Sequence, residues 1–206
     1  TLEAAQLARL DHICRKLDLT PRDHLLEIGT GWGGMAIHAA QHYGCRVTTT
    51  TISQEQFNLA SERVRAAGLE DRISVLLKDY RDLDGQYDKL VSIEMIEAVG
   101  HDFYDTYFGK CATLLKDDGL MLLQAITIAD QRYDAARKSV DFIQRYIFPG
   151  SCIPSVTAMN ASITRASDLK LAHLEDIGPH YATTLRLWRE NFFRNIEAVR
   201  ALGYPE

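Results

Sequence analysis

The sequence lacks the features of a membrane-spanning, exported or metal-binding protein. No apolar run approaches the roughly 20 residues needed to cross a bilayer, and the first residues show neither the basic region nor the apolar core of a signal peptide. The four cysteines stand far apart and form no C-x-x-C pair, so zinc-ligand spacing is absent and a dense disulfide framework is not expected. We therefore expect reduced cysteines, no metal and a cytoplasmic protein.

The sequence also lacks an excess of positive charge. Its 206 residues include 23 Lys and Arg against 28 Asp and Glu, which gives a formal net charge of -5. Bulk nucleic-acid binding needs a strongly basic surface, so nucleic acid is not an expected partner. With 46% hydrophobic and 25% charged residues, the composition is typical of a folded, water-soluble chain. The length suits one α/β domain over residues 1–206.

Strand-like and helix-like segments alternate through the first part of the chain. Because parallel strands need crossover connections, this alternation predicts an α/β fold, Rossmann-like, with a mostly parallel sheet and helices on both faces. Apolar periodicity and β-branched runs place the elements. Strands are predicted at 25–28, 45–52, 73–77, 87–95 and 120–128, and helices at 2–17, 35–42, from Ser53 onward and at 103–115.

The alternation changes after the fifth predicted strand. We interpret residues 130–165 as a helical insertion within the same domain. Phe148-Pro149-Gly150 marks a helix end there. The remaining predictions are helices over 133–146 and 156–164, a sixth strand over 169–177 and a long final helix over 181–202.

A glycine cluster after the first strand gives the first indication of a ligand. Gly29, Gly31 and Gly34 satisfy G-x-G-x-x-G, which is compatible with dinucleotide binding. Glu27, however, stands two residues before the first glycine and places a carboxylate next to the ligand. A carboxylate repels a pyrophosphate but suits a cationic amino group. The pattern Glu27-x-Gly29-x-Gly31-x-Gly33 therefore resembles the S-adenosylmethionine-binding motif of class I methyltransferases.

The end of the second strand offers polar but uncharged groups. Nicotinamide enzymes and most methyltransferases place Asp or Glu near this point to hold ribose hydroxyls. Here the hydroxyls of Thr51 and Ser53 and the amide of Gln56 can form those hydrogen bonds instead. Ser53 and Gln56 also form a capping-box pattern, so helix capping is an alternative role.

Asp79, Tyr80 and Arg81 follow the third predicted strand. In such a fold this loop lies beside the adenine edge, so we predict that these residues bind the cofactor. An ordinary loop position is the alternative for a lone Asp.

Five segments make the chain similar to one family, the cyclopropane-fatty-acyl-phospholipid synthases and the related mycolic acid cyclopropane synthases. The resemblance covers nearly the whole chain. The glycine loop is common to many methyltransferases, whereas the later segments are more particular to this family. The segments are LEIGTGWGG at 26–34, TISQEQ at 51–56, DYRDL at 79–83, SIEMIEAVG at 92–100 and YIFPG at 146–150.

The resemblance implies chemistry on a lipid. The cofactor would be S-adenosylmethionine, whose methyl is attacked by a cis double bond of a phospholipid acyl chain; bicarbonate would then take a proton from the carbocation so that a cyclopropane closes. The resemblance assigns Glu97, Tyr181 and the backbone of Ile126 to the bicarbonate site, and Ile93 to the cofactor site. Gln124 replaces the family's His; it can hydrogen-bond bicarbonate but cannot carry a proton near neutral pH.

The resemblance also implies an apolar tunnel for the acyl chain and peripheral contact with the inner membrane face. Family regions before the first helix and after residue 206, including a final strand, have no counterpart here, so we expect a fragment of a longer chain. Exposed sheet edges would then favour a homodimer. Candidates for lining the tunnel, with core packing as the alternative, are Trp32, Tyr133, Phe142, Tyr146, Ile147, Phe148 and Trp188.

Several other functions stay open from the sequence. Gln124 leaves a methyl-branched product possible. A methyltransferase for a small soluble molecule would share the glycine loop, and a non-catalytic cofactor-binding module would lack transfer altogether. A nicotinamide-dependent oxidoreductase ranks last, because nothing near the end of the second strand is acidic.

Overall fold

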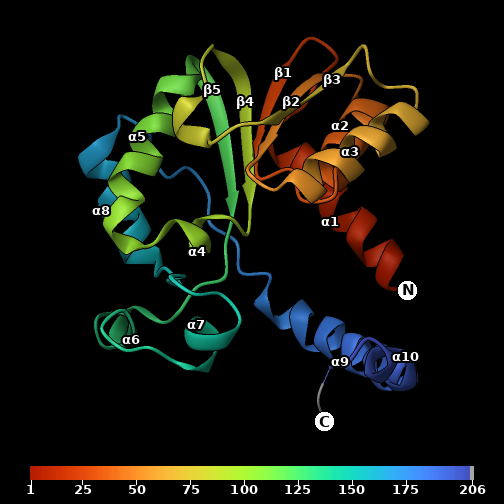
Figure 1. Cartoon of the computed structure of the whole chain (residues 1–206). Helices are drawn as coiled ribbons and strands as arrows, with labels where there is room; N and C mark the ends of the chain where they lie inside the picture. Colours follow the sequence, from red (N-terminus) through yellow and green to blue (C-terminus); the bar gives the residue numbers. More distant parts are fainter. Residues whose placement is uncertain (205–206) are drawn as a thin grey trace. The chain divides into compact units, whose positions relative to one another are not determined.

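A computed structural model describes residues 1–204 of the chain. It divides into two compact units, a large one formed by residues 9–170 and a small one formed by residues 1–8 together with the chain from residue 171 onward. The large unit holds the sheet (Figure 1). The helix α1 (Leu2–Lys16) begins in the small unit and continues into the large one.

The large unit is built on a five-stranded sheet with the order β3-β2-β1-β4-β5. Every neighbouring pair is parallel, which confirms the predicted α/β fold. The order reverses between β1 and β4, and ligands of such sheets bind at this switch point, outside the carboxyl ends of the strands. The strands are β1 (His24–Ile28), β2 (Arg46–Thr51), β3 (Ile73–Leu77), β4 (Tyr87–Ile93) and β5 (Leu115–Gln124).

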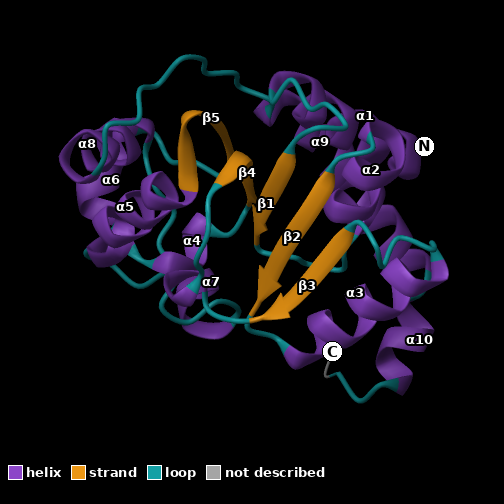
Figure 2. Ribbon diagram, turned by 90° about the horizontal axis from the view of Figure 1, so that it is seen from above, coloured by secondary structure: helices purple, strands orange, loops and turns teal. Residues whose placement is uncertain are grey.

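Helices pack on both faces of the sheet (Figure 2). Successive residues of β1 point to opposite faces: Leu25 belongs to a hydrophobic cluster with α1 and α2, whereas Leu26 and Ile28 belong to a second cluster with α5. The helices of this unit after α1 are α2 (Gly34–Tyr43), α3 (Gln54–Ala66), η1 (Tyr80–Asp82), α4 (Ile96–Val99), η2 (His101–Phe103), α5 (Tyr104–Leu114), α6 (Asp130–Ala136), α7 (Phe142–Tyr146) and α8 (Val156–Ala166).

The insertion differs from the single helix predicted over 133–146. α6 ends at Ala136, and α7 begins only after Asp141. The reason is a local capping box: Asp141 Oδ1 accepts from the Gln144 amide at 2.8 Å, and Gln144 Oε1 accepts from the Asp141 amide at 3.0 Å. These bonds start a new helix at 142. The helix predicted at 156–164 is confirmed as α8.

Two strand predictions are also corrected. β5 begins at Leu115 rather than 120 and ends at Gln124, because a bulge places Leu115 opposite Tyr87 and Leu120 opposite Lys89. The sixth strand predicted over 169–177 is wrong. Residues 171–177 have no regular secondary structure, and apolar side chains alone do not make a strand without a hydrogen-bonded neighbour.

The small unit contains α9 (Gly178–Arg194) and α10 (Ile196–Ala201) in place of one final helix. The break lies at Asn195, whose side-chain amide donates to the Asn191 carbonyl at 2.8 Å and so competes with the helical backbone. Among the described residues, no helix combines the length and apolar character that a bilayer crossing requires.

Candidate functional site

The predicted site residues of the large unit gather at one edge of the sheet. Because β1, β2, β4 and β5 are parallel, their carboxyl ends meet there. We call residues 27–33, 51–56 and 79–81 the cofactor side. We call Glu94, Glu97, Gln124 and Ile126, together with Arg9, the reaction side.

The glycine loop is held by the backbone of β2. The amides of Gly29 and Thr30 both donate to the Thr50 carbonyl, at 3.1 and 2.9 Å. Gly29, Gly31 and Gly33 have φ values of 101°, 51° and 81°, which side chains rarely adopt. A Cβ at Gly31 would meet nothing within 4 Å, so the loop backbone there is open to a ligand.

Glu27 is buried at the end of β1, with 3% of its surface exposed. The Thr49 hydroxyl donates to Glu27 Oε2 at 2.7 Å and lies at the same distance from the Thr30 hydroxyl. Burial raises the pKa of Glu27 to about 8, although the Thr49 hydrogen bond acts in the opposite direction. A nearby ammonium would favour the ionised form. The carboxyl is therefore suited to a cationic ligand group.

Thr51, Ser53 and Gln56, which are predicted to bind the ribose, lie together where β2 ends and α3 begins. The Ser53 hydroxyl accepts from the Gln56 amide at 3.3 Å and caps α3. The Gln56 side chain does not complete a capping box, because its Oε1 accepts from the Thr51 hydroxyl at 2.7 Å. Because the oxygen of the Gln56 amide faces Thr51, its nitrogen is the end that can donate to a ligand oxygen.

Asp79 and Arg81 form a fixed ion pair after β3. The Arg81 guanidinium donates to Asp79 Oδ1 at 3.0 Å and to Oδ2 at 2.7 Å, and these bonds hold the pKa of Asp79 below its ordinary value. Asp79 is thus an oriented, ionised acceptor. Tyr80 turns toward the core, with its ring 5.5 Å from that of Tyr107.

Glu97 and Ile126, both predicted from the family resemblance, contact each other on the reaction side. The Ile126 amide donates to Glu97 Oε1 at 2.6 Å. Glu97 Oε2 is buried and has no hydrogen-bond partner within the described residues. Burial is the main cause of a raised pKa of Glu97, which the charge of Glu94 raises further.

Gln124 lies between two charged residues that the sequence analysis missed. Its Nε2 donates to Glu94 Oε1 at 2.6 Å, and its Oε1 accepts from Arg9 Nη1 at 2.7 Å. Arg9 is 115 positions away, and nothing in the local pattern of residues 94 or 9 indicates the contact. Ile93, at the end of β4, packs against the hydrophobic cluster that includes α1 and α2.

Tyr181 lies in the small unit, in the first turns of α9, and is half-buried. Its assignment to the bicarbonate site stays a prediction. Trp188, in the same helix, is half-exposed.

The other apolar candidates fall into two groups. Tyr133 packs against the hydrophobic cluster around α5, which agrees with a core role. The remaining candidates are not core residues, because at least half of each is exposed: Trp32, Phe142, Tyr146, Ile147 and Phe148.

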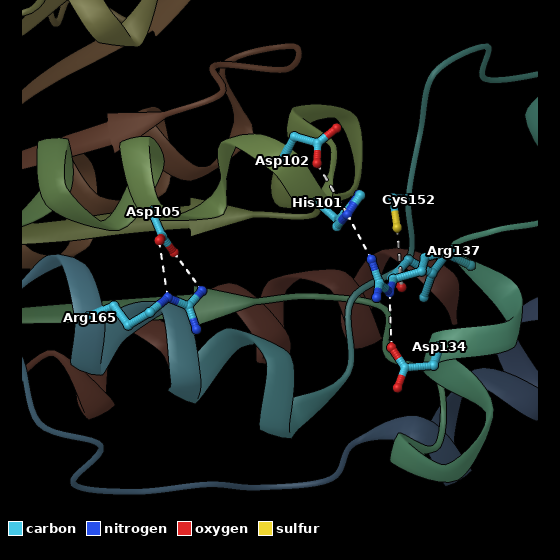
Figure 3. A network of polar contacts seen from close by, with 8 residues as sticks. His101, Asp102, Asp105, Asp134, Arg137, Cys152 and Arg165 are labelled. Carbon is cyan, nitrogen blue, oxygen red and sulfur yellow. Dashed lines mark hydrogen bonds and ion pairs between the residues drawn. The ribbon is translucent and has the colours of Figure 1, made fainter.

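Polar contacts link the insertion to η2, where Arg137 faces His101 (Figure 3). Arg137 Nη1 lies 3.0 Å from His101 Nε2, and Arg137 Nε lies 2.9 Å from Asp134. The same His101 nitrogen lies 3.2 Å from Asp102 Oδ1. The amide of Cys152 also donates to the Glu97 carbonyl at 2.8 Å. The insertion therefore contacts both α4 and η2.

Comparison with known proteins identifies this arrangement. The family described as mycolic acid cyclopropane synthetase matches residues 1–206. The chain is 42% identical over 205 residues to tuberculostearic acid methyltransferase UfaA1 of Mycobacterium tuberculosis, covering 100% of this chain and 48% of that protein. It is 43% identical over 192 residues to cyclopropane-fatty-acyl-phospholipid synthase of Escherichia coli K12, covering 93% of this chain and 47% of that protein. The chain thus spans about half the length of the curated relatives it matches.

Solved structures show the same fold. Mycolic acid cyclopropane synthase CmaA1, in complex with SAH and CTAB, superimposes with a TM-score of 0.90 at 32% identity, over 98% of this chain and 74% of that chain. Coclaurine N-methyltransferase, bound to N-methylheliamine and SAH, superimposes with a TM-score of 0.76 at 25% identity, over 98% of this chain and 58% of that chain. The chain therefore has the class I methyltransferase fold.

Proposed function

The chain belongs to the mycolic acid cyclopropane synthetase family, and on that premise we propose that it transfers the methyl group of S-adenosylmethionine to a cis double bond of a phospholipid acyl chain. One observation carries the proposal: Glu97, a half-buried carboxyl with one buried oxygen, stands at the same sheet edge as the glycine loop. A Cβ at Gly29 would lie only 3.4 Å from the Cβ of Met95, two residues before Glu97. The glycine loop and the segment that carries Glu97 therefore lie side by side.

The cofactor side fits S-adenosylmethionine through groups of three kinds. Glu27 is a buried carboxyl that an ammonium would ionise, the amide nitrogen of Gln56 would donate to ribose oxygens, and Asp79 would accept from an adenine amino group. The bound cofactor would supply an electrophilic methyl. A Cβ at Gly31 would meet no atom within 4 Å, so the cofactor can approach the loop backbone closely at this point.

The reaction side fits a small anion such as bicarbonate. Glu97 Oε2 is a buried polar atom without a hydrogen-bond partner in the described part of the chain. Burial raises the pKa of Glu97, which favours its protonated form; a protonated Oε2 would donate to an anion's oxygen while Oε1 stays fixed by the Ile126 amide. Bicarbonate would supply a base for the proton that leaves the carbocation.

The insertion supports a lipid acceptor. Phe142, Tyr146 and Phe148 are mostly exposed, and the guanidinium of Arg145 lies 5.5 Å from the centre of the Tyr146 ring. Apolar and aromatic side chains beside a cation suit the interface between acyl chains and anionic headgroups. We place the peripheral contact with the inner membrane face at this segment.

A methyl-branched product is the second candidate. Gln124 stands where the family has a His and cannot relay a proton, and one relative that covers the whole chain is described as a tuberculostearic acid methyltransferase. The two outcomes share the methyl transfer. They differ in which proton leaves the carbocation: a proton lost from the added methyl closes the ring, whereas a proton lost from a neighbouring carbon leaves an alkene.

The test uses the full natural chain that carries this sequence. It is incubated with S-adenosylmethionine and vesicles of a cis-monounsaturated phospholipid, and the acyl chains are analysed by mass spectrometry and proton NMR. We expect a gain of one CH2, with high-field ring protons if a cyclopropane has formed. Saturable cofactor binding without transfer to lipid would instead support a non-catalytic module. Transfer only to soluble amines or alcohols would support a small-molecule methyltransferase, and binding of NAD alone would overturn the cofactor assignment.

A further inference from the structure

The side chain of Gln124 is held from both ends by groups of opposite charge. Arg9 Nη1 donates to its Oε1 at 2.7 Å, and its Nε2 donates to Glu94 Oε1 at 2.6 Å. The backbones of Glu94 and Gln124 are also hydrogen-bonded, because the Glu94 amide donates to the Gln124 carbonyl at 2.8 Å. A residue of α1 and the residue after β4 thus meet on one carboxamide at the end of β5.

These two contacts allow only one orientation of the amide. A guanidinium has donors and no acceptor, and an ionised carboxylate has acceptors and no donor. If the carboxamide flipped, its nitrogen would face Arg9 and its oxygen would face Glu94, and both hydrogen bonds would be lost. Hydrogen bonds to charged groups are stronger than those between neutral groups. The orientation is therefore set by Arg9 and Glu94 together.

The backbone of Glu94 shows that this arrangement has a cost. Its φ of +51° is one that a residue with a side chain rarely adopts. Such conformations persist where the surroundings hold them, and they cluster at functional sites. Glu94 is held by its amide and its carboxylate, both of which bond to Gln124.

We propose that Arg9 and Glu94 are positioning residues that lock the Gln124 carboxamide with its oxygen toward Arg9 and its nitrogen toward Glu94. This inference rests on the proposed function: on the reaction side, the locked amide takes the place of the family's histidine as an oriented hydrogen-bonding group.

The lock itself is tested without activity, by NMR of the 15N-labelled full natural chain. The side-chain amide signal of Gln124 is identified by its loss in Gln124→Met. We expect Arg9→Met and Glu94→Leu to move that signal, whereas Arg15→Met leaves it in place. Arg15 is the matched control because it lies on the same helix, is exposed and pairs with Asp11 instead. An unmoved Gln124 signal in Arg9→Met would overturn the lock.

The functional part is tested by a double-mutant cycle on methyl transfer. We expect Arg9→Met to lower kcat about tenfold, with the Kd for S-adenosylmethionine changed less than twofold and with partial rescue in Arg9→Lys. In the Gln124→Met background the same Arg9 change should have almost no further effect, because no amide remains to be oriented. An equal loss in both backgrounds would show that Arg9 acts elsewhere. If the parent chain methylates no lipid, the proposed function fails, while the NMR result still decides the lock.

Discussion

The cofactor side and the reaction side share one sheet edge but are built differently. On the cofactor side, contacts join a loop to the next strand or helix, as in the bond of Thr51 to Gln56 five positions away. On the reaction side, contacts join distant segments: Ile126 is 29 positions from Glu97, and Arg9 is 115 positions from Gln124. The cofactor side includes a glycine loop with a constrained backbone, whereas the contacts of the reaction side depend on how distant segments pack.

This difference separates two kinds of change. A substitution that disturbs the backbone of the glycine loop alters folding and cofactor binding together. A substitution on the reaction side removes one interaction while the loop keeps its shape. Because the two kinds of change act on different groups, turnover and cofactor affinity should be separable by mutation.

The largest effect is expected for Glu97→Gln on the reaction side. The substitution keeps the shape and one oxygen for the Ile126 amide but removes the carboxyl whose raised pKa suits it to hold a proton. Loss of general acid or base function typically costs about 100-fold or more in rate, so we expect kcat to fall by that factor with cofactor Kd nearly unchanged. Steady-state kinetics and calorimetry measure the two quantities. The control is Glu62→Gln at an exposed position of α3, and unchanged turnover in Glu97→Gln would remove Glu97 from the reaction.

The next largest effect is expected for Gly33→Ala on the cofactor side. Gly33 has a φ of 81°, and a Cβ there would lie 3.2 Å from the Cβ of Ala60. Strain of this kind costs about 1–3 kcal/mol, so both the free energy of unfolding and the affinity for S-adenosylmethionine should fall. Urea titration and calorimetry test this.

Gly34→Ala provides the control for that change. Gly34 lies one residue further along, and a Cβ there meets nothing within 4 Å. As the first residue of α2, it should tolerate alanine or gain a little stability. Equal behaviour of the two variants would show that the loop backbone is not constrained as the structure indicates.

The same difference explains what the sequence could predict. The parallel sheet and the alternation of its five strands with helices follow from local patterns such as the glycine loop and the Ser53 cap. Glu97 and Ile126 came from family resemblance, and the structure brings them together. No local pattern indicated Arg9 and Glu94, because their contacts with Gln124 depend on how α1 packs and on the unusual φ of Glu94. The prediction of a sixth strand was wrong because apolar composition does not indicate whether a neighbouring strand is present.

A third prediction concerns the pH dependence of stability. The pKa of Glu27 in the folded chain is about 8, above its ordinary value of 4.5. The folded state therefore binds the proton more tightly, so the stabilisation is complete below pH 4.5 and is lost as the pH rises toward 8. Each pH unit in this window changes stability by up to about 1.4 kcal/mol. Thermal unfolding of the cofactor-free chain should show Tm falling with pH, and Glu27→Gln should flatten the curve; parallel curves for both chains would contradict the assignment.

The smallest effect is expected for Gln124→His, which tests whether the reaction side tolerates the family's residue. A neutral imidazole has one donor and one acceptor, so it can replace both bonds of the carboxamide, to Glu94 and to Arg9. Binding of S-adenosylmethionine should therefore stay unchanged. Unlike the amide, imidazole titrates near neutral pH, so the ratio of cyclopropane to alkene product, followed by NMR between pH 6 and 8, should become pH-dependent with a change of a few-fold. Gln86→His, at an exposed position, is the control. An identical product profile would mean that the orientation of the group at position 124 matters more than its ability to carry a proton.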